Sequence, residues 1–372
     1  MRALLLLPVL LLSPLLPSLF SADSGPTWQR SFFFDEAKAD FSISDFACPS
    51  ATFCIAVGAI EQNTGTPYPH AVITRDGGAH WSSSKPSEFP VSLFFLSDTT
   101  GWMLTEHGIW NTVDAAATWK KIQSGKGYFR VFFTDAQHGW LAGDKRLFEQ
   151  TADGGAHWSA LPDVANAVAA APAEVAFEYV HFSDPHHGIA LAEAGGRPDR
   201  GLPVWMDPES AQYRRASNGG VCACQSSDSG HSWTCGSVGL YRKLITAAFP
   251  AANRGWLVFE PESPSKLFSE VIERNWSAWE STTVWHLDGA SILDLSAGAD
   301  GSLAIAAVQI QGKLIDSPLP GKVRIFTGGD FASLQEEPVD YRAVARRIML
   351  ANAGSEWFAA TDTGMILHRL KP

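Results

Sequence analysis

The chain has 372 residues, enough for one large domain or two ordinary ones. Its composition is that of a globular protein, with 45% hydrophobic and 18% charged residues, 32 glycines and 14 tryptophans. The formal net charge of −11 argues against a nucleic-acid partner, because phosphate binding needs clustered Lys and Arg.

The first 22 residues have the pattern of an export signal. Arg2 is the only early charge, and an apolar run from Ala3 to Phe20 follows it, ending at the small pair Ser21-Ala22. A membrane anchor is the alternative, but prolines interrupt the run and no charge follows it. No other apolar stretch is long enough to span a bilayer. We therefore expect a secreted or periplasmic protein, without a membrane span after signal cleavage, that folds from residues 23–372.

An eight-residue motif, Ser/Thr-x-Asp-x-Gly-x-x-Trp, recurs along the chain. We expect its aspartate to accept hydrogen bonds from backbone N–H groups of a tight turn, and its glycine to supply a positive φ. The tryptophan would begin the next strand and bury its ring between neighbouring sheets. Copies lie at 21–28, 74–81, 112–119 (which lacks the glycine), 151–158 and 226–233. The structural residues predicted from them are Asp23, Trp28, Asp76, Trp81, Asp114, Trp119, Asp153, Trp158, Asp228 and Trp233.

The five cysteines suit an oxidising compartment. Cys48 and Cys54 flank a short segment, and a turn there would bring them within bridging range. Around the fourth internal motif, Cys224 would lie opposite Cys235 if the motif forms a hairpin, which leaves Cys222 unpaired. Zinc binding by these last three cysteines is the alternative.

A second motif, a Gly-hydrophobic strand such as Gly101-Trp102, alternates with the first. Seven copies begin near residues 53, 100, 138, 187, 254, 301 and 356. Each follows an apolar segment and a short polar turn, which is the pattern of two paired strands. With the strands on either side of the Asp motif, this makes units of four antiparallel strands, and such units repeated radially form a β-propeller.

The later units deviate from the repeat. Only one Gly-hydrophobic strand lies between Trp158 and Trp233, so blade 4 is expected to carry an insertion at about 194–220. The fifth and sixth Asp motifs are degenerate, near 275–279 and 328–331. The last unit ends at 365–368 with no motif after it, and the strand beginning at Trp28 would complete it. The predicted fold is all-β: a seven-bladed β-propeller of four-stranded antiparallel blades, closed by the N-terminal strand so that no sheet edge is exposed there.

The Asp motif resembles the Asp-box, or bacterial neuraminidase repeat, of β-propellers. Together with the Gly-Trp strands and the export signal, it resembles the photosystem II stability/assembly-factor-like family over nearly all of residues 23–372. That resemblance implies a single seven-bladed propeller; in photosynthetic organisms the family escorts photosystem II assembly. Because the fifth and sixth boxes are degenerate and the insertion is unusual, the photosynthetic role is not transferred. Asp-boxes also occur in sialidases and in xyloglucan-cleaving glycosidases, which use a cleft between two propellers.

Sequence motifs for chemistry are sparse. A sialidase would need an arginine triad and a Phe/Tyr-Arg-Ile-Pro string, whose nearest counterpart here is 129–132, without the proline. The set His181, Asp184, His186 and His187 could bind a metal, but is favoured as turn residues. No phosphate-binding glycine loop and no Gly-x-Ser-x-Gly nucleophile turn is present. We therefore expect no cofactor, no metal and no catalytic residue.

Charged residues in or beside the inner strands are the candidate ligand-binding group. They would line the central channel or its rim, and they are Arg130, Glu178, Lys243, Asp294, Arg346 and Arg347. Mixed charge there could bind a polar ligand or a partner's peptide; a solvated channel of neutralising pairs is the alternative.

The predicted function is that of a non-catalytic binding or scaffold propeller, such as an assembly factor, which acts as a monomer and recognises a protein or a carbohydrate polymer. The alternative is a sialidase-type glycoside hydrolase that uses Glu178 and Asp294, whose carboxyl groups would then be about 5–10 Å apart.

Overall fold

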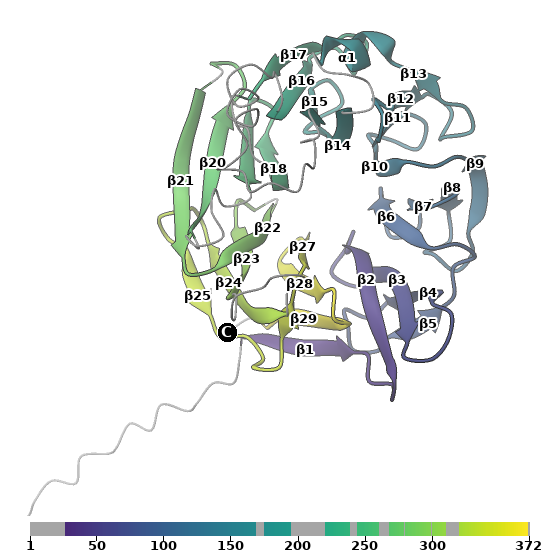
Figure 1. Cartoon of the computed structure of the whole chain (residues 1–372), viewed down its shortest axis with the longest axis vertical. Helices are drawn as coiled ribbons and strands as arrows, with labels where there is room; N and C mark the ends of the chain where they lie inside the picture. The colour runs from purple at the N-terminus through teal and green to yellow at the C-terminus, as the bar shows by residue number, and fades with distance from the viewer. Residues whose placement is uncertain are drawn as a thin grey trace, which may run out of the picture.

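The computed structural model describes residues 27–168, 175–194, 220–238, 244–259, 268–278, 280–298, 300–309 and 320–370. They form seven antiparallel sheets arranged as a ring (Figure 1). Six sheets have four strands and one has five. The predicted all-β, seven-bladed fold is confirmed.

In blades 1 to 6 the strands follow chain order from the axis outward (Figure 1). Blade 1 contains β2 (Ala39–Ala47), β3 (Cys54–Gln62), β4 (Tyr68–Thr74) and β5 (Ser82–Ser84). Blade 2 contains β6 (Pro90–Phe95), β7 (Gly101–Thr105), β8 (Gly108–Thr112) and β9 (Lys120–Ser124). Blade 3 contains β10 (Tyr128–Phe133), β11 (Gly139–Gly143), β12 (Phe148–Thr151) and β13 (Ser159–Ala160).

The second half of the ring repeats this order. Blade 4 contains β14 (Val175–Phe182), β15 (Gly188–Ala194), β16 (Gly220–Ser226) and β17 (Thr234–Ser237). Blade 5 contains β18 (Leu244–Ala251), β19 (Arg254–Phe259), β20 (Phe268–Asn275) and β21 (Glu280–Asp288). Blade 6 contains β22 (Ser291–Ala297), β23 (Leu303–Gln309), β24 (Gly321–Gly328) and β25 (Gln335–Glu337), and β26 (Val344–Ala345) also pairs with β24.

Blade 7 joins the two ends of the chain, as the sequence predicts. It contains β27 (Ile348–Ala353), β28 (Glu356–Thr361), β29 (Met365–Arg369) and, as its outer strand, β1 (Trp28–Phe33). Figure 1 shows β1 alongside β29. Trp28 is fully buried, and its indole Nε1 donates to Glu337 Oε2 at 2.8 Å. The N-terminal strand thus closes the ring and also contacts blade 6.

Two features differ from the simple repeat. A short helix, α1 (Pro162–Ala167), connects blades 3 and 4, where the sequence shows no helical periodicity; it begins at a proline and packs Val164 into the core. The fifth strand of blade 6, β26, was not expected either. The insertion predicted at about 194–220 lies, apart from its two ends, outside the described residues, and those ends, Ala194 and Gly220, are paired in the ladder of β15 and β16.

The hydrophobic core lies between adjacent blades. Trp102 of blade 2 stacks on Phe133 of blade 3 with ring centroids 3.6 Å apart, and Trp140 stacks on Phe182 of blade 4 at 3.8 Å. The other face of each phenylalanine ring needs a glycine, because a Cβ on Gly139 would lie 2.6 Å from the Phe133 ring and one on Gly188 would lie 2.5 Å from the Phe182 ring. The Gly-Trp motif is therefore a packing element between blades.

The cysteines pair as predicted. Disulfides join Cys48 to Cys54 and Cys224 to Cys235, and Cys222 is a buried free thiol. The alternative of a three-cysteine zinc site is wrong, since two of its thiols form a disulfide. Disulfides are typical of proteins in oxidising compartments. Among the described residues, no helix is long and apolar enough to cross a bilayer.

Candidate functional site: the central channel

The Asp-box turns hold their own carboxylates. In the first of them, His80 N donates to Asp76 Oδ1 at 2.9 Å, and the hydroxyl of Thr74 donates to the same oxygen at 2.9 Å. The bond from the backbone N–H of His80 is the main reason why the pKa of Asp76 falls to about 2. Gly77 and Gly78 have φ of 71° and 87°, a region that favours glycine. This carboxylate is engaged in shaping its turn.

The other described boxes repeat these bonds. Their aspartates accept a backbone N–H four residues along the chain and a hydroxyl two residues before, and they are Asp114, Asp153 and Asp228. The box tryptophans are half-buried, and they are Trp81, Trp119, Trp158 and Trp233. Asp23 lies outside the described residues.

A β-bulge occurs at the same place in six of the seven inner strands. The pairing of β2, β6, β10, β14, β18 and β22 with the next strand skips one residue in each case. A bulge re-aims the side chains that follow it. The residues that come directly after the bulges are Asp45, Ser92, Arg130, Tyr179, Thr246 and Asp294. We refer to these six side chains as the axial network.

Arg130 links one half of the axial network. Its Nη1 lies 3.5 Å from Asp45 Oδ2 and 3.4 Å from Ser92 Oγ, and its guanidinium lies 5.5 Å from the centre of the Tyr179 ring. Asp45 also accepts the backbone N–H of Leu93 in the next blade at 2.7 Å. The network thus connects the inner strands of blades 1 to 4 through side-chain and backbone bonds.

Asp294 links the other half. Thr246 of blade 5 donates its hydroxyl to Oδ1 at 2.8 Å, and Leu350 N of blade 7 donates to Oδ2 at 2.8 Å. Leu295 N adds a third bond to Oδ1 at 2.9 Å. Burial outweighs these bonds and raises the pKa of Asp294 to about 6. Both oxygens of this carboxylate therefore hold three blades together.

The raised pKa gives a prediction for Asp294→Asn. Folded Asp294 binds its proton more tightly than the unfolded chain does, so its contribution to stability is greatest below about pH 4 and is lost as the pH rises to about 6. Asparagine does not titrate, so the stability of the Asp294→Asn variant does not fall in this way. We expect the unfolding free energy of the wild type to fall by about 2 kcal/mol relative to the variant across this window, measured by urea denaturation at several pH values. Asp153→Asn is the control of opposite sign, since its pKa is lowered to about 2 by its bonds to His157. Parallel curves for wild type and Asp294→Asn would contradict the assignment.

Four aromatic rings form an arc near the carboxyl-terminal ends of the inner strands. Phe94 and Phe132 lie 4.9 Å apart, Phe132 meets His181 edge-on at 5.1 Å, and His181 stacks on Phe249 at 5.1 Å. All four side chains are half-buried, and they come from the successive blades 2, 3, 4 and 5. Burial lowers the pKa of His181 to about 4, so the arc is uncharged at neutral pH. We refer to these four residues as the aromatic arc.

Phe249, the last residue of the aromatic arc, packs differently from its counterpart in blade 4. In blade 4 the ring of Phe182 covers Gly188, whereas in blade 5 the ring of Trp276 covers the equivalent Gly255. Phe249, the counterpart of Phe182, packs partly against the core cluster that contains Trp276 and also stacks on His181.

The structure separates the candidate ligand-binding residues. Arg130 and Asp294 are in the axial network, while Glu178 is the bulged residue of β14 and is half-buried. Arg346 and Arg347 precede β27; Arg346 pairs with Asp362 at 3.0 Å, and Arg347 donates to the carbonyl oxygen of Ser44. Lys243 lies outside the described residues.

The histidine-rich turn is occupied by its own bonds. Asp184 accepts the backbone N–H groups of His186 and His187 as well as His187 Nδ1, and His186 Nδ1 lies 2.9 Å from Ser229 Oγ. His181 is part of the aromatic arc. Within the described parts of the chain, no group of three or more His, Cys, Asp or Glu side chains is placed to hold a metal ion.

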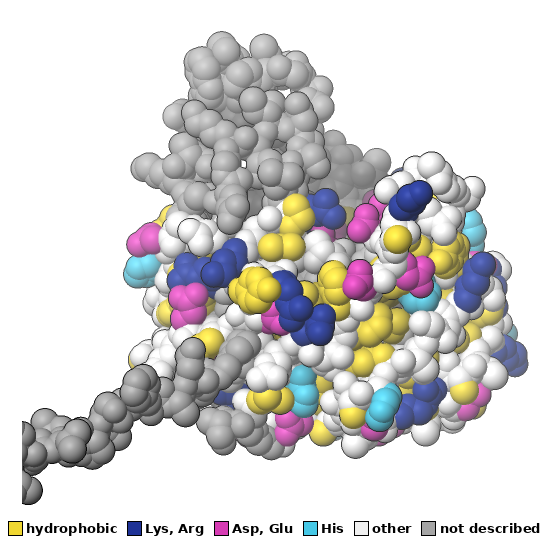
Figure 2. Space-filling model, turned by 90° about the horizontal axis from the view of Figure 1, so that it is seen from below, with side chains coloured by type: hydrophobic (Ala, Val, Ile, Leu, Met, Phe, Trp, Pro, Cys, Tyr) yellow, Lys and Arg dark blue, Asp and Glu magenta, His cyan; other side chains and the backbone are white. Residues whose placement is uncertain are grey.

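The side of the ring seen in Figure 2 carries mixed charge. Lys and Arg side chains lie beside Asp and Glu side chains there, without one contiguous basic patch. Ion pairs among blades 6 and 7 fit this picture, such as Arg324 with Glu336 at 2.7 Å and Arg369 with Glu337.

Solved structures show the same architecture. No protein-family model matches the chain, and no curated protein matches it by sequence. YCF48 bound to D1 peptide is similar at 14% identity, with a TM-score of 0.58 over 91% of this chain and 99% of that one. YCF48 from Cyanidioschyzon merolae is similar at 13% identity, with a TM-score of 0.57 over 92% of this chain and 98% of that one.

The fold of this chain is also similar to that of an enzyme. Oligogalacturonate lyase from Vibrio parahaemolyticus is 7% identical, with a TM-score of 0.56 over 94% of this chain and 95% of that one. At such identities a shared fold is common to unrelated functions. The resemblance to photosystem II assembly factors expected from the sequence is thus found in the solved structures, and what these likenesses establish for this chain is the β-propeller fold.

Proposed function

We propose that this protein is an exported, non-catalytic binding propeller that recognises a protein partner through the aromatic arc at the end of its channel. The observation that carries the proposal is the arc itself: four half-exposed rings from four neighbouring blades, in contact with one another. Aromatic side chains are enriched at the centres of protein interfaces, where they provide much of the binding energy.

The chemistry of the channel supports binding over catalysis. Asp45 and Asp294 use their oxygens on backbone N–H groups, a hydroxyl and Arg130, so these carboxylates act as connectors between strands. In this proposal Arg346 and Arg347, which precede the inner strand β27, lie at the end of the channel opposite the aromatic arc. The YCF48 structure with a D1 peptide gives a precedent for peptide binding on this fold. The apolar N-terminal run and two disulfides support a secreted or periplasmic location.

Co-purification from the native cell envelope tests this proposal. The wild type is expected to retain a protein partner, and Phe132→Ala with Phe249→Ala is expected to reduce its recovery at least ten-fold, as losing two interface anchors does. Phe268→Ala is the matched control, because Phe268 also stacks on a histidine, His286 at 5.4 Å, but on the outer strands of blade 5. Equal recovery with both variants would overturn the proposal.

A sialidase-type glycoside hydrolase is the second candidate. It is favoured by one observation, a carboxyl group with a pKa of about 6, Asp294, in a channel that also holds Arg130 and Tyr179. Fluorogenic sialosides and a polysaccharide panel test it. Turnover that is abolished by Glu178→Gln or Asp294→Asn would establish catalysis and replace the binding proposal.

A further inference from the structure

In blades 2, 3 and 5 an aromatic ring closes the space between the blade and a turn of the next blade. Trp102 of blade 2 donates its Nε1 to the carbonyl of Gly154 at 3.1 Å. Trp140 of blade 3 lies so near Gly230 that a Cβ there would be 2.6 Å from its Nε1. Trp256 of blade 5 meets Phe331 edge-on at 4.9 Å. In each case the indole extends from the second strand to the neighbouring turn and fills the gap.

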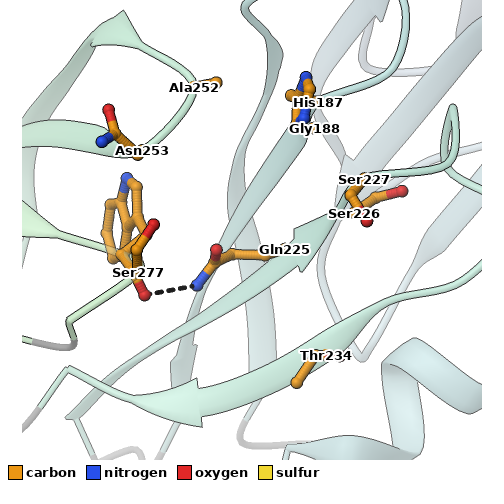
Figure 3. A pocket seen from close by; sticks show the side chains of 10 residues that line it. His187, Gly188, Gln225, Ser226, Ser227, Thr234, Ala252, Asn253 and Ser277 are labelled. Atoms are coloured by element: carbon orange, nitrogen blue, oxygen red, sulfur yellow. Dashed lines mark hydrogen bonds between the residues drawn. The ribbon is translucent and has the colours of Figure 1, made fainter.

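Blade 4 lacks this ring. Ile189 occupies the position, since it pairs with Gln225 in the sheet as Trp140 pairs with Gln150. Ile189 is buried in one apolar cluster with Trp276 of blade 5, below the surface of this interface. At this interface the structure has a pocket of about 460 Å³, bounded by β16 and β17 on one side and by the turns of blade 5 on the other (Figure 3).

The pocket wall is polar and almost without charge. Gln225, Ser227 and Thr234 line it from blade 4, and Asn253 and Ser277 line it from blade 5. In Figure 3 these side chains surround one space, across which Gln225 Nε2 donates to the carbonyl of Trp276 at 3.3 Å. Four of them, the hydroxyls of Ser227, Thr234 and Ser277 and the amide of Asn253, have no hydrogen-bond partner among the described residues.

Of the described residues that line the pocket, His187 is the one with a titratable side chain, and it already has a partner. His187 Nδ1 lies 2.8 Å from Asp184 Oδ2, which holds the ring toward its own turn. Among the described residues, no Lys, Arg, Asp or Glu side chain lines the pocket, so an ion bound there would lack a counter-charge from them.

We propose that this pocket between blades 4 and 5 binds a neutral sugar. Hydroxyl and amide groups both donate and accept hydrogen bonds, and sugar hydroxyls are the ligand groups that also do both. The volume lies within the range of small-molecule sites. This site is separate from the aromatic arc, so it provides a second recognition function and does not depend on the protein-binding proposal.

The proposal is tested by titrating the purified protein with glucose, maltose, cellobiose and lactose, with binding measured by calorimetry and NMR. At least one of these sugars is expected to bind with a Kd of about 1 mM or tighter. The double variant Asn253→Ala with Ser277→Ala is expected to weaken that binding at least ten-fold; both side chains are exposed, so the fold is retained.

Gln150→Ala is the matched control, because Gln150 has the same place in blade 3, where Trp140 fills the gap. It is expected to leave sugar binding unchanged. The proposal is overturned if none of the four sugars binds, if Gln150→Ala weakens binding as much as the double variant, or if sialyllactose binds more tightly than lactose. Loss of the protein partner in the arc variants with sugar binding intact would show that the two sites act separately.

Discussion

Replacing Trp28 with alanine is expected to lower the unfolding free energy by about 3–5 kcal/mol, the usual cost of deleting a buried tryptophan. Trp28 is fully buried, packs among residues of blades 6 and 7, and donates to Glu337. Its strand supplies the outer edge of blade 7, so the loss also weakens the pairing of β1 with β29. Urea denaturation followed by tryptophan fluorescence measures the change.

Trp119→Ala is the control for this variant. Trp119 is a half-buried box tryptophan in blade 2 and takes no part in closing the ring. We expect it to lose less stability than Trp28→Ala. An equal or smaller loss for Trp28→Ala would show that the ring does not depend on the N-terminal strand.

Removing the carboxylate of Asp45 is expected to have a comparable effect. Asp45 is 8% exposed and accepts bonds from Phe46 N, Leu93 N and Arg130, so Asp45→Ala leaves two backbone donors and a guanidinium without their acceptor. Leaving a buried donor without its acceptor costs about 1–3 kcal/mol for each of the two backbone N–H groups, and the Arg130 side chain, which is 41% exposed, adds less. Because the bond to Leu93 joins blades 1 and 2, thermal unfolding should begin at a lower temperature.

Asp45→Asn separates charge from hydrogen bonding. The amide oxygen can still accept one or both backbone N–H bonds, so we expect a smaller loss than for alanine. If the two variants are equally destabilised, the ion pair with Arg130 outweighs the backbone bonds. If neither is destabilised, the axial network has no structural role.

Much of the fold was predictable because its determinants are local. The Asp-box turn is held by bonds within a few residues, as between Thr74, Asp76 and His80, so its pattern survives in the sequence. The repetition of the two motifs then predicted the four-stranded blade, and the lack of a fourth strand in the last unit pointed to the strand that begins at Trp28. One disulfide followed from the same register, since Cys224 and Cys235 are direct partners across β16 and β17, and the other followed from the short turn between Cys48 and Cys54.

The candidate site was less predictable because it depends on contacts between blades. Asp294 and Arg130 were recognised as channel residues, but nothing in the sequence marks the bulges that place them with Asp45 and Tyr179. The doublet Phe132-Phe133 was a usable signal, since one ring enters the core and the other enters the arc. The exchange that puts Trp276 over Gly255 and Phe249 against His181 involves residues far apart in the sequence, so no local pattern encodes it.

The pairing of β1 with β29 constrains how the protein can be made. Of the strands in the described residues, β1 is synthesised first, and its partner β29 follows more than 330 residues later. Blades 1 to 6 could assemble while synthesis continues, but blade 7 has to wait for the final residues. Until then the apolar face of β1 has no cover, and any passage across a membrane would be completed most safely before that last pairing forms.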